Sequence, residues 1–384
     1  MNRRSLDVVL LWAVLCLVGL GVVMVYSASS VNAAAKLGDP DFYLKRQGAF
    51  AALGVVALFI GSALPVKFWH DVALPALGIA FLSLILVKIP GLGRVGGGAQ
   101  RWLQIGPLGF QPSELCKFAL LNFLAYSLYK QRDQIRTLKY GFLPHVLVPG
   151  AMGALLMLQP DFGTTVVLLL LAGLLMILGG VRLRYLLVSL GAGVPLAVIA
   201  VMRSDYRMKR ILAFLDPWAH RQDIGYQVAE SLISFGSGGL AGQGLGAGKQ
   251  KLFFLPAAHT DFIFAIIGEE LGLVGVMLTV GLFGLIAWRG MRAFRRLGPT
   301  PQGYLCAGLT SLIVLQAATN MAVVMGLLPT KGLTLPFVSY GGSSLIAFCF
   351  MAGVLLRLSG DSLEHEVSRP TFTVGVLRPL GVRA

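Results

Sequence analysis

The feature that most constrains this chain is its series of long apolar runs, because a helix needs about 20 apolar residues to cross a lipid bilayer. Only 13% of the 384 residues are charged, against about 25% in soluble domains. Inside lipid, helices satisfy all their own backbone groups. We therefore expect an all-α polytopic membrane protein with about ten transmembrane helices. The runs begin near Asp7, Gln47, Asp71, Gln111, Phe142, Gly163, Tyr185, Phe262, Leu305 and Gly342.

The distribution of Lys and Arg over the short connections predicts the orientation of these helices. A cytoplasmic N-terminus places thirteen Lys and Arg on inner connections and seven on short outer ones, as the positive-inside rule requires. The first run resembles a secretory signal but is long, and nine more follow, so we expect an uncleaved helix. Both termini are then cytoplasmic, with a transmembrane domain over residues 1–360 and a cytoplasmic tail over 361–384.

One outer connection, residues 203–260, is much longer than the others. Structureless loops of this length are uncommon, and the stretch YQVAESLISF places Gln227, Glu230, Ser231 and Ser234 on one helical face. This pattern fits either a short helix lying in the membrane interface or a helix that caps the bundle. We expect one long extracytoplasmic loop that contains interfacial helices.

Basic residues are frequent on the predicted outer side. The 203–260 loop carries seven basic and four acidic residues, which fits either plain solvated surface or a site for a lipid phosphate or pyrophosphate. Two short motifs are misleading. The glycines of GLGRVGGG lie in an outer loop instead of between a strand and a helix, and Asp161-Phe162-Gly163 lacks the other kinase motifs, so neither indicates a nucleotide site.

Charged residues inside the apolar runs are costly, at least about 2.5 to 3.5 kcal/mol each at mid-bilayer. Glu114 and Lys117 are spaced i, i+3, so their opposite charges can meet on one helical face. They form either a neutralised pair that stabilises packing or a pair that faces a water-filled cavity. In PAAHTDFIFAIIGEELG, Asp261 precedes the run and should lie near the outer interface. On a continuous helix Glu269 lies about 12 Å deeper, so we expect Glu269 and Glu270 to bond to neighbouring helices or to be held neutral.

Ordered sequence blocks along nearly the whole chain resemble the SEDS family of bacterial peptidoglycan polymerases, named for shape, elongation, division and sporulation. Two stretches, GLGAGKQKLFFLPAAHTDFIFAIIGEE and GLLPTKGLTLPFVSYGGSS, resemble the cell-division branch more than the elongation branch. Ala257 and Ala258 depart from the family, which commonly has an acidic or arginine residue at one of these places. The other blocks are VMVYSASS, GAQRWLQIGPLGFQPSELCK, LQPDFGTT, FLDPW and GSGGLAGQGLG.

The resemblance implies a glycosyltransferase of the bacterial inner membrane that uses lipid II, a disaccharide-pentapeptide on undecaprenyl pyrophosphate. The acidic residue that the family treats as essential matches Asp261, which could act as general base toward the attacking sugar hydroxyl. Departure of the pyrophosphate calls for cations. The candidates are Lys117, Arg101 and Lys331, followed by Arg210 and Lys249.

Further binding roles follow from the same resemblance. Glu114 would hold Lys117 or help to ligate a divalent cation such as Mg²⁺, although the sequence has no dedicated metal cluster and indicates no organic cofactor. Hydrogen bonds to sugar or phosphate, or structural capping, are equally suited to a second group of residues: Gln111, Ser113, His259 and Thr260.

The resemblance also implies partners: a monofunctional class B penicillin-binding protein transpeptidase and other divisome or elongasome membrane proteins, but no nucleic acid. One rival function is a lipid II flippase, because transporters also carry intramembrane charges. The sequence shows no matching pair of interrupted helices, however, and Asp261 lies at the outer edge of its run. The other rival is a scaffold, which does not need the charges of Glu114 and Lys117. We therefore favour the polymerase.

Overall fold

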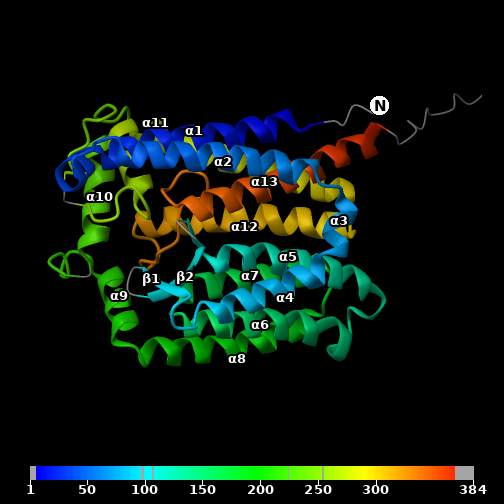
Figure 1. Ribbon diagram of the computed structural model, residues 1–384. Coiled ribbons are helices and arrows are strands. Elements are labelled where there is room, and N and C mark those ends of the chain that lie inside the picture. The colour runs from blue at the N-terminus through cyan, green and yellow to red at the C-terminus, as the bar shows by residue number, and fades with distance from the viewer. Residues whose placement is uncertain (1–5, 97–98, 106–107, 224, 253–254, 368–384) are drawn as a thin grey trace, which may run out of the picture.

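The protein is a bundle of helices with irregular elements gathered at one end (Figure 1). The computed structural model describes residues 6–96, 99–105, 108–223, 225–252 and 255–367. The main helices run side by side, and the end of the bundle that carries a small sheet, α9 and α10 is called the sheet end below (Figure 1). The opposite end carries the short helix α3 (Val66–Asp71) and both the start of α1 and the end of α13.

Each of the ten predicted apolar runs forms a helix, and the all-α polytopic prediction is confirmed. In the described ranges, seven helical stretches are long and apolar enough to cross a membrane, and two more, α4 and α7, are shorter apolar helices. The tenth, α5, contains Glu114 and Lys117. The bounds are α1 (Val8–Leu37), α2 (Phe42–Ala63), α4 (Ala73–Leu86), α5 (Pro112–Lys130), α6 (Leu143–Leu158), α7 (Phe162–Leu178), α8 (Leu183–Met202), α11 (Ile263–Leu297), α12 (Pro301–Val324) and α13 (Gly342–Val367).

Local sequence explains where several helices begin. Asp7 caps α1 by accepting a hydrogen bond from Leu10 N at 3.1 Å, and Asp161 caps α7 through Thr164 N at 3.2 Å. Thr300 caps α12, whose first helical residue is Pro301. Side-chain oxygens at the N-cap satisfy otherwise unpaired N–H groups, and proline suits the first turn, so these starts follow from the sequence.

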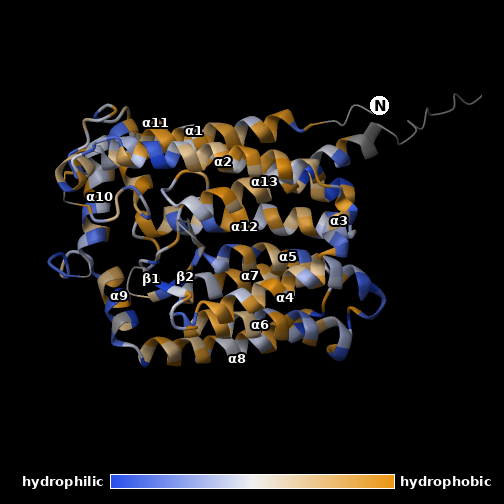
Figure 2. Cartoon of the chain, viewed as in Figure 1, coloured by the Kyte–Doolittle hydropathy of each residue, from blue (hydrophilic) through white to orange (hydrophobic). Residues whose placement is uncertain are grey.

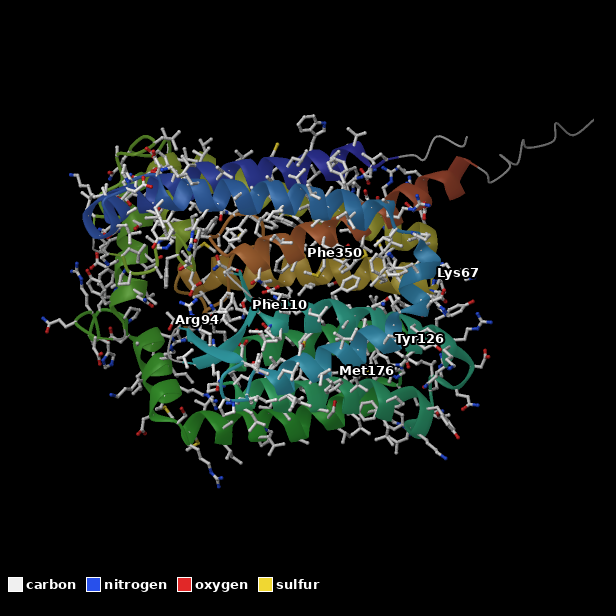
Figure 3. The ribbon with its side chains drawn as sticks, in the orientation of Figure 1. Lys67, Arg94, Phe110, Tyr126, Met176 and Phe350 are labelled. Atoms are coloured by element: carbon white, nitrogen blue, oxygen red, sulfur yellow. The ribbon has the colours of Figure 1, made fainter. Side chains whose placement is uncertain are left out.

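The helices pack closely because small residues lie where two backbones approach. A Cβ at Gly61 of α2 would collide with the Phe350 carbonyl, and one at Gly353 of α13 would collide with the Leu58 carbonyl. Small residues at such contacts are typical of membrane helices, which gain packing instead of hydrophobic transfer on association. Apolar residues cover the helices along their length, and hydrophilic residues gather at both ends (Figure 2). Arg94 lies at the sheet end, Lys67 lies at the opposite end, and Phe350 lies between the helices (Figure 3).

A three-stranded antiparallel sheet between α4 and α5 was not predicted. Its strands, in the order β1-β2-β3, are β1 (Gly93–Gly96), β2 (Ala99–Ile105) and β3 (Leu108–Phe110). The glycine-rich stretch GLGRVGGG therefore supplies an edge strand. A Cβ at Gly93 would collide with the Val87 carbonyl, so close approach of the backbone requires glycine there.

The long connection between α8 and α11 contains two helices, α9 (Asp205–Leu215) and α10 (Tyr226–Gly238). The polar face of α10 is buried: Glu230, Ser231 and Ser234 are at most 3% exposed. Ser231 Oγ donates to the Val324 carbonyl at the end of α12, at 2.6 Å. Of the two predicted roles for this helix, the structure supports the one in which it caps the bundle.

The helix α11 is interrupted at Gly272, whose φ of 63° and ψ of −158° are not helical. The loop that follows α10 supplies hydrogen bonds at this break, from Gln243 N to the Glu269 carbonyl and from Leu273 N to the Gly239 carbonyl, both at 3.0 Å. Glu269 and Glu270 precede the break, so both lie on the continuous helical part that begins at Ile263, and the predicted depth of Glu269 stays a prediction. Both glutamates lie against the 203–260 connection.

The domain boundary at residue 360 stays a prediction. The last helix, α13, continues to Val367. The remainder of the predicted tail, residues 368–384, lies outside the described residues.

Candidate active site

The segment before α11 holds Asp261 by its main chain. Asn320 Nδ2 donates to the Asp261 carbonyl at 2.8 Å, and Ser339 Oγ donates to the Thr260 carbonyl at 2.7 Å. Tyr340 N donates to the His259 carbonyl at 2.9 Å. Three successive carbonyls are thus fixed by α12 and by the segment between α12 and α13, so the position of Asp261 is set by parts of the chain that are distant in sequence.

The carboxylate of Asp261, unlike its main chain, is not held by neighbouring residues in the described ranges. Within the described ranges, no hydrogen bond or ion pair engages this half-buried carboxylate. Burial raises the pKa of Asp261 from its ordinary value of 3.8 to about 6, against the opposing effect of the positive charge of Arg210. A carboxylate with a pKa just below neutral pH is ionised under working conditions and still basic enough to accept a proton.

Basic residues from α9 and from the segment after α12 meet at the start of α7. The guanidinium of Arg207 and the ammonium of Lys331 lie 5.5 and 5.6 Å from the ring centroid of Phe162. Arg210 Nη1 donates to the Thr330 carbonyl at 2.9 Å. The next residue after Lys331, Gly332, lies so close to Asp261 that a Cβ there would be 3.5 Å from Oδ2. The structure therefore places cationic groups beside the candidate base.

The predicted contact between Glu114 and Lys117 is present, and the pair is deeply buried. Lys117 Nζ lies 2.8 Å from Glu114 Oε2, and the lysine side chain is 2% exposed. The same ammonium donates to Gln316 Oε1 at 2.8 Å and lies 4.8 Å from the centroid of the Phe348 ring. Because the side chain is almost fully buried and its ammonium contacts Glu114, Gln316 and Phe348, Lys117 faces the protein interior and not an open phosphate site.

Two further candidates, Arg101 and His259, lie in different parts of the site. Arg101, on β2, donates to the carbonyls of Gln159 and Pro160 and so braces the turn before α7. The ring of His259 lies 4.6 Å from that of Tyr43, and burial lowers its pKa to about 4, so the imidazole is neutral at pH 7.

The remaining polar candidates for sugar or phosphate binding are Thr260, Gln111 and Ser113. Thr260 Oγ1 donates to the Ala257 carbonyl at 3.1 Å. Gln111 stands at the N-cap of α5 without a side-chain capping bond. Ser113 Oγ is buried without a hydrogen-bond partner among the described residues. The contact of Thr260 agrees with a structural role, whereas no hydrogen bond within the described ranges explains the Gln111 side chain or the buried Ser113 hydroxyl.

Lys249 belongs to a second polar cluster that includes both glutamates of α11. Its side chain is exposed, and its main-chain N donates to Glu269 Oε1 at 2.7 Å. Glu270 pairs with Lys251 Nζ at 2.7 Å and accepts hydrogen bonds from Ser27 Oγ of α1 at 2.6 and 2.8 Å. The expectation that the glutamates bond to neighbouring helices is confirmed for Glu270, which bonds to α1, whereas the partners of Glu269 belong to the loop before α11.

A divalent cation has no evident cage in this region. In the part of the chain that the structure describes, no group of three or more His, Cys, Asp or Glu side chains could hold a metal ion. A cation at Glu114 would also share the carboxylate with the positive charge of Lys117, whose Nζ lies 2.8 Å from Oε2. The option of Mg²⁺ at Glu114 stays a prediction.

Several site residues were missed from the sequence. Phe162 belongs to the kinase-like motif that was set aside, and Arg207 was included only in the general group of basic residues on the outer side. Gln316 and Asn320 give a signal that could have been used, because polar side chains within an apolar membrane run usually face a partner or a cavity.

Comparison with known proteins gives one consistent result. Residues 8–363 match the FtsW, RodA and SpoVE family, described as cell cycle proteins. The chain is 44% identical over 354 residues to the protein named "Probable peptidoglycan glycosyltransferase FtsW" of Geobacter metallireducens, covering 92% of this chain and 94% of the relative. It is 43% identical over 372 residues to the protein of the same name in Saccharophagus degradans, covering 96% of each.

Solved structures show the same similarity. The rod shape determining protein RodA of Thermus thermophilus superposes with a TM-score of 0.69 at 30% identity, covering 94% of this chain and 99% of that one. A chain from a peptidoglycan synthase complex that coordinates polymerization and crosslinking superposes with a TM-score of 0.76 at 32% identity, covering 93% and 98%.

Proposed function

The chain belongs to the FtsW, RodA and SpoVE family of cell cycle proteins, and we propose that it polymerises lipid II into glycan strands. It is a multi-pass membrane peptidoglycan glycosyltransferase and is most like FtsW. One observation carries the proposed chemistry: the Asp261 carboxylate is free of internal partners among the described residues, while its main chain is fixed beside basic side chains.

In this reaction Asp261 is the general base. It takes the proton from the 4-hydroxyl of the GlcNAc of an incoming lipid II as the hydroxyl oxygen attacks the anomeric carbon of the lipid-linked strand. The bond from that carbon to undecaprenyl pyrophosphate breaks, and the pyrophosphate leaves with the electron pair. The pKa of Asp261, raised by burial to about 6, keeps the group ionised yet basic at neutral pH.

The leaving pyrophosphate is stabilised by Lys331, Arg207 and Arg210. Their positions support this role. Arg207 and Lys331 both contact Phe162, and Arg210 bonds to Thr330, the residue before Lys331. Arg101 supports this site indirectly by bracing the turn that leads into Phe162. Lys117 acts through its internal partners, because both its burial and its three contacts keep it within the protein.

The biological setting follows from the relatives. The curated relatives carry the FtsW name, which favours septal synthesis in division over the elongation role of a RodA-type enzyme. The similar peptidoglycan synthase complex couples polymerization to crosslinking, which supports a class B penicillin-binding protein transpeptidase as partner. We place the sheet end, with Asp261, at the outer face of the inner membrane and both termini in the cytoplasm.

The orientation can be tested at Gln243, an exposed residue of the loop after α10. A cysteine at this position should react with a membrane-impermeant thiol reagent in intact spheroplasts. Labelling that appears only after lysis would place this loop in the cytoplasm and reverse the topology.

The function is tested with the purified full-length chain and its cognate penicillin-binding protein, supplied with lipid II. The native chain should produce glycan strands, and Asp261→Asn should not, while translocation of lipid II across vesicles is measured separately. A folded native chain that makes no polymer, or an Asp261→Asn chain that makes it normally, overturns the proposal. Normal polymer from Asp261→Asn together with loss of translocation in Glu269→Gln would support a flippase instead.

A further inference from the structure

A buried segment without helical structure follows α12. Residues 331–340 form no helix or strand, yet Leu333, Leu335, Phe337 and Val338 are at most 6% exposed. Irregular backbone inside a membrane bundle is tolerated only where the protein satisfies its N–H and C=O groups. The groups that satisfy this segment therefore fix its position.

Two amide side chains of α12 supply these hydrogen bonds. Gln316 and Asn320 are 1% and 2% exposed, and their spacing of i, i+4 places them on one face, about 6 Å apart along the axis. Gln316 Nε2 donates to the Thr334 carbonyl at 3.0 Å, and Asn320 Nδ2 donates to the Leu333 carbonyl at 2.7 Å. The segment thus lies alongside α12, and the carbonyls of its successive residues Leu333 and Thr334 each accept a hydrogen bond from one of the two amides.

Each amide also reaches a second part of the site. Asn320 Nδ2 donates to the Asp261 carbonyl at 2.8 Å, so one nitrogen joins the main chain of the candidate base to that of Leu333. Gln316 Oε1 accepts from Lys117 Nζ at 2.8 Å. Successive turns of α12 therefore connect the base on one side and the Glu114–Lys117 pair on the other to the same segment.

The two donor bonds determine how the Asn320 amide is turned. With Nδ2 directed at two carbonyls, Oδ1 is buried and has no hydrogen-bond partner among the described residues. A buried acceptor without a partner costs about 1 to 3 kcal/mol. The Asn320 amide is thus turned so that Nδ2 bonds to both main-chain segments, although Oδ1 then has no hydrogen-bond partner among the described residues.

We propose that Asn320 is a positioning residue for Asp261, and that Gln316 plays the same part for Lys117. This inference rests on the proposed function of Asp261 as base. Because the Asp261 carboxylate has no internal partner among the described residues, its distance from Lys331 and Gly332 depends on how the main chain is held. Asn320 makes the bond to Asp261 itself, while Ser339 and Tyr340 hold the two residues before it. A displacement of about 1 Å at a reacting group can reduce the rate by about 10²-fold.

The test replaces each amide by an apolar side chain of similar size, in the full-length chain with its cognate penicillin-binding protein. Asn320→Leu removes both donor bonds to Asp261 and Leu333. It should lower kcat for lipid II polymerisation by about 10- to 10²-fold and leave KM within about threefold, because substrate-binding side chains are untouched. Gln316→Leu, which does not touch the Asp261 main chain, should lower kcat by a smaller factor.

Thr319→Val is the matched control on the same helix. Thr319 Oγ1 donates only to the Leu315 carbonyl of α12 itself, so kcat and KM should both stay at native values. All rates are expressed per folded molecule, counted by monodisperse elution in detergent. If Asn320→Leu gives no folded protein, Asn320→Ser replaces it, because serine keeps a single donor. The Asn320→Ser chain should have a native melting temperature and a reduced kcat.

The outcomes separate this inference from the proposed function. A native chain that does not polymerise lipid II defeats the proposed function and this inference with it. An inactive Asp261→Asn chain beside an Asn320→Leu chain with native kcat per folded molecule defeats the inference alone. It is also overturned by a rise in KM at constant kcat, which would make Asn320 a binding residue, and by failure of both Asn320 variants to fold.

Discussion

The carboxylates on either side of the first turn of α11 have opposite environments. Glu270 is fully buried and its oxygens are bonded by Ser27, Lys251 and Gly246 N, while Glu269 accepts from two successive main-chain N–H groups. Asp261 has its main chain held, but its carboxylate has no bond or ion pair within the described ranges. Each glutamate is thus bonded to other parts of the protein, although Glu269 Oε2 is buried without a hydrogen-bond partner among the described residues, whereas in the proposed reaction the partner of the Asp261 carboxylate is the substrate.

The largest expected effect separates these carboxylates by activity. Asp261→Asn keeps the shape of the side chain but cannot accept a proton, so polymerisation should fall by about 10² to 10⁴-fold. Glu269→Gln keeps an oxygen for the N–H groups of Lys249 and Gln250, so its rate per folded molecule should stay native. Lipid II polymerisation at equal membrane abundance checks both variants.

The comparison breaks down if the two variants behave alike. Equal loss in both would show that Glu269 and Asp261 act as one unit. Retained activity in Asp261→Asn would remove the base altogether.

The next effect concerns stability at the glutamate cluster. Lys251→Met leaves the Glu270 carboxylate buried without its ion-pair partner, and loss of one partner of a buried pair costs about 3 to 5 kcal/mol. The melting temperature in detergent should fall, with native activity in the molecules that remain folded. Lys251→Met combined with Glu270→Gln should recover part of the loss, since no unpaired charge then remains.

An unchanged melting temperature in Lys251→Met would mean that the cluster does not stabilise the fold. A loss of activity per folded molecule would instead connect the cluster to the reaction and weaken the contrast with Asp261.

A smaller effect is expected for the basic residues beside Asp261. Lys331→Met removes a half-buried cation from the proposed pyrophosphate site, and a hydrogen bond to a charged group contributes about 1.5 to 3 kcal/mol. The KM for lipid II should therefore rise by about tenfold or more. Lys249→Met is the matched control, because Lys249 is an exposed lysine of the same end of the molecule, and its KM should not change. Equal shifts in both variants would indicate a general electrostatic attraction in place of a site.

The helices could be predicted from the sequence because hydrophobic length is a local property. The ten apolar runs and the caps at Asp7 and Asp161 are all contained in short stretches. The sheet at 93–110 and the break at Gly272 could not be predicted in this way. The break depends on distant backbone, since its bonds come from Gly239 and Gln243, some thirty residues earlier. The strands of the sheet pair with their neighbours along the chain, but hydrophobic length does not reveal such a pairing.

The site was predictable to the extent that it uses charge in apolar surroundings. Asp261 and the Glu114–Lys117 pair were identified for that reason, and their contacts are as described above. Arg207 of α9 and Phe162 of α7 are far apart in the chain, and only the fold brings them within 5.5 Å. The role of Lys117 also needed the structure, because Gln316 and Phe348 are about 200 residues away in the chain.

The smallest expected effect is on the pH dependence of the melting temperature. It follows from the burial of the Asp261 carboxylate without a bonded partner among the described residues. Burial raises its pKa from 3.8 to about 6, so the folded protein binds this proton more tightly than the unfolded chain does. The stabilisation from the protonated form is complete below about pH 4 and is lost as the pH rises through about 6. Asn at this position has no proton to lose, so Asp261→Asn should melt a few degrees higher than the native chain at about pH 7.5.

At about pH 4 the two chains should melt at the same temperature, because the native aspartate is then protonated and as uncharged as the amide. Glu270→Gln provides the opposite case: it leaves Lys251 without its anionic partner and should melt lower than the native chain at about pH 7.5. Intrinsic fluorescence melting in detergent at both pH values measures all three chains. An Asp261→Asn chain that melts lower than native at the higher pH would mean that the folded protein stabilises the ionised carboxylate, and Asp261 would then join the glutamates as a structural residue.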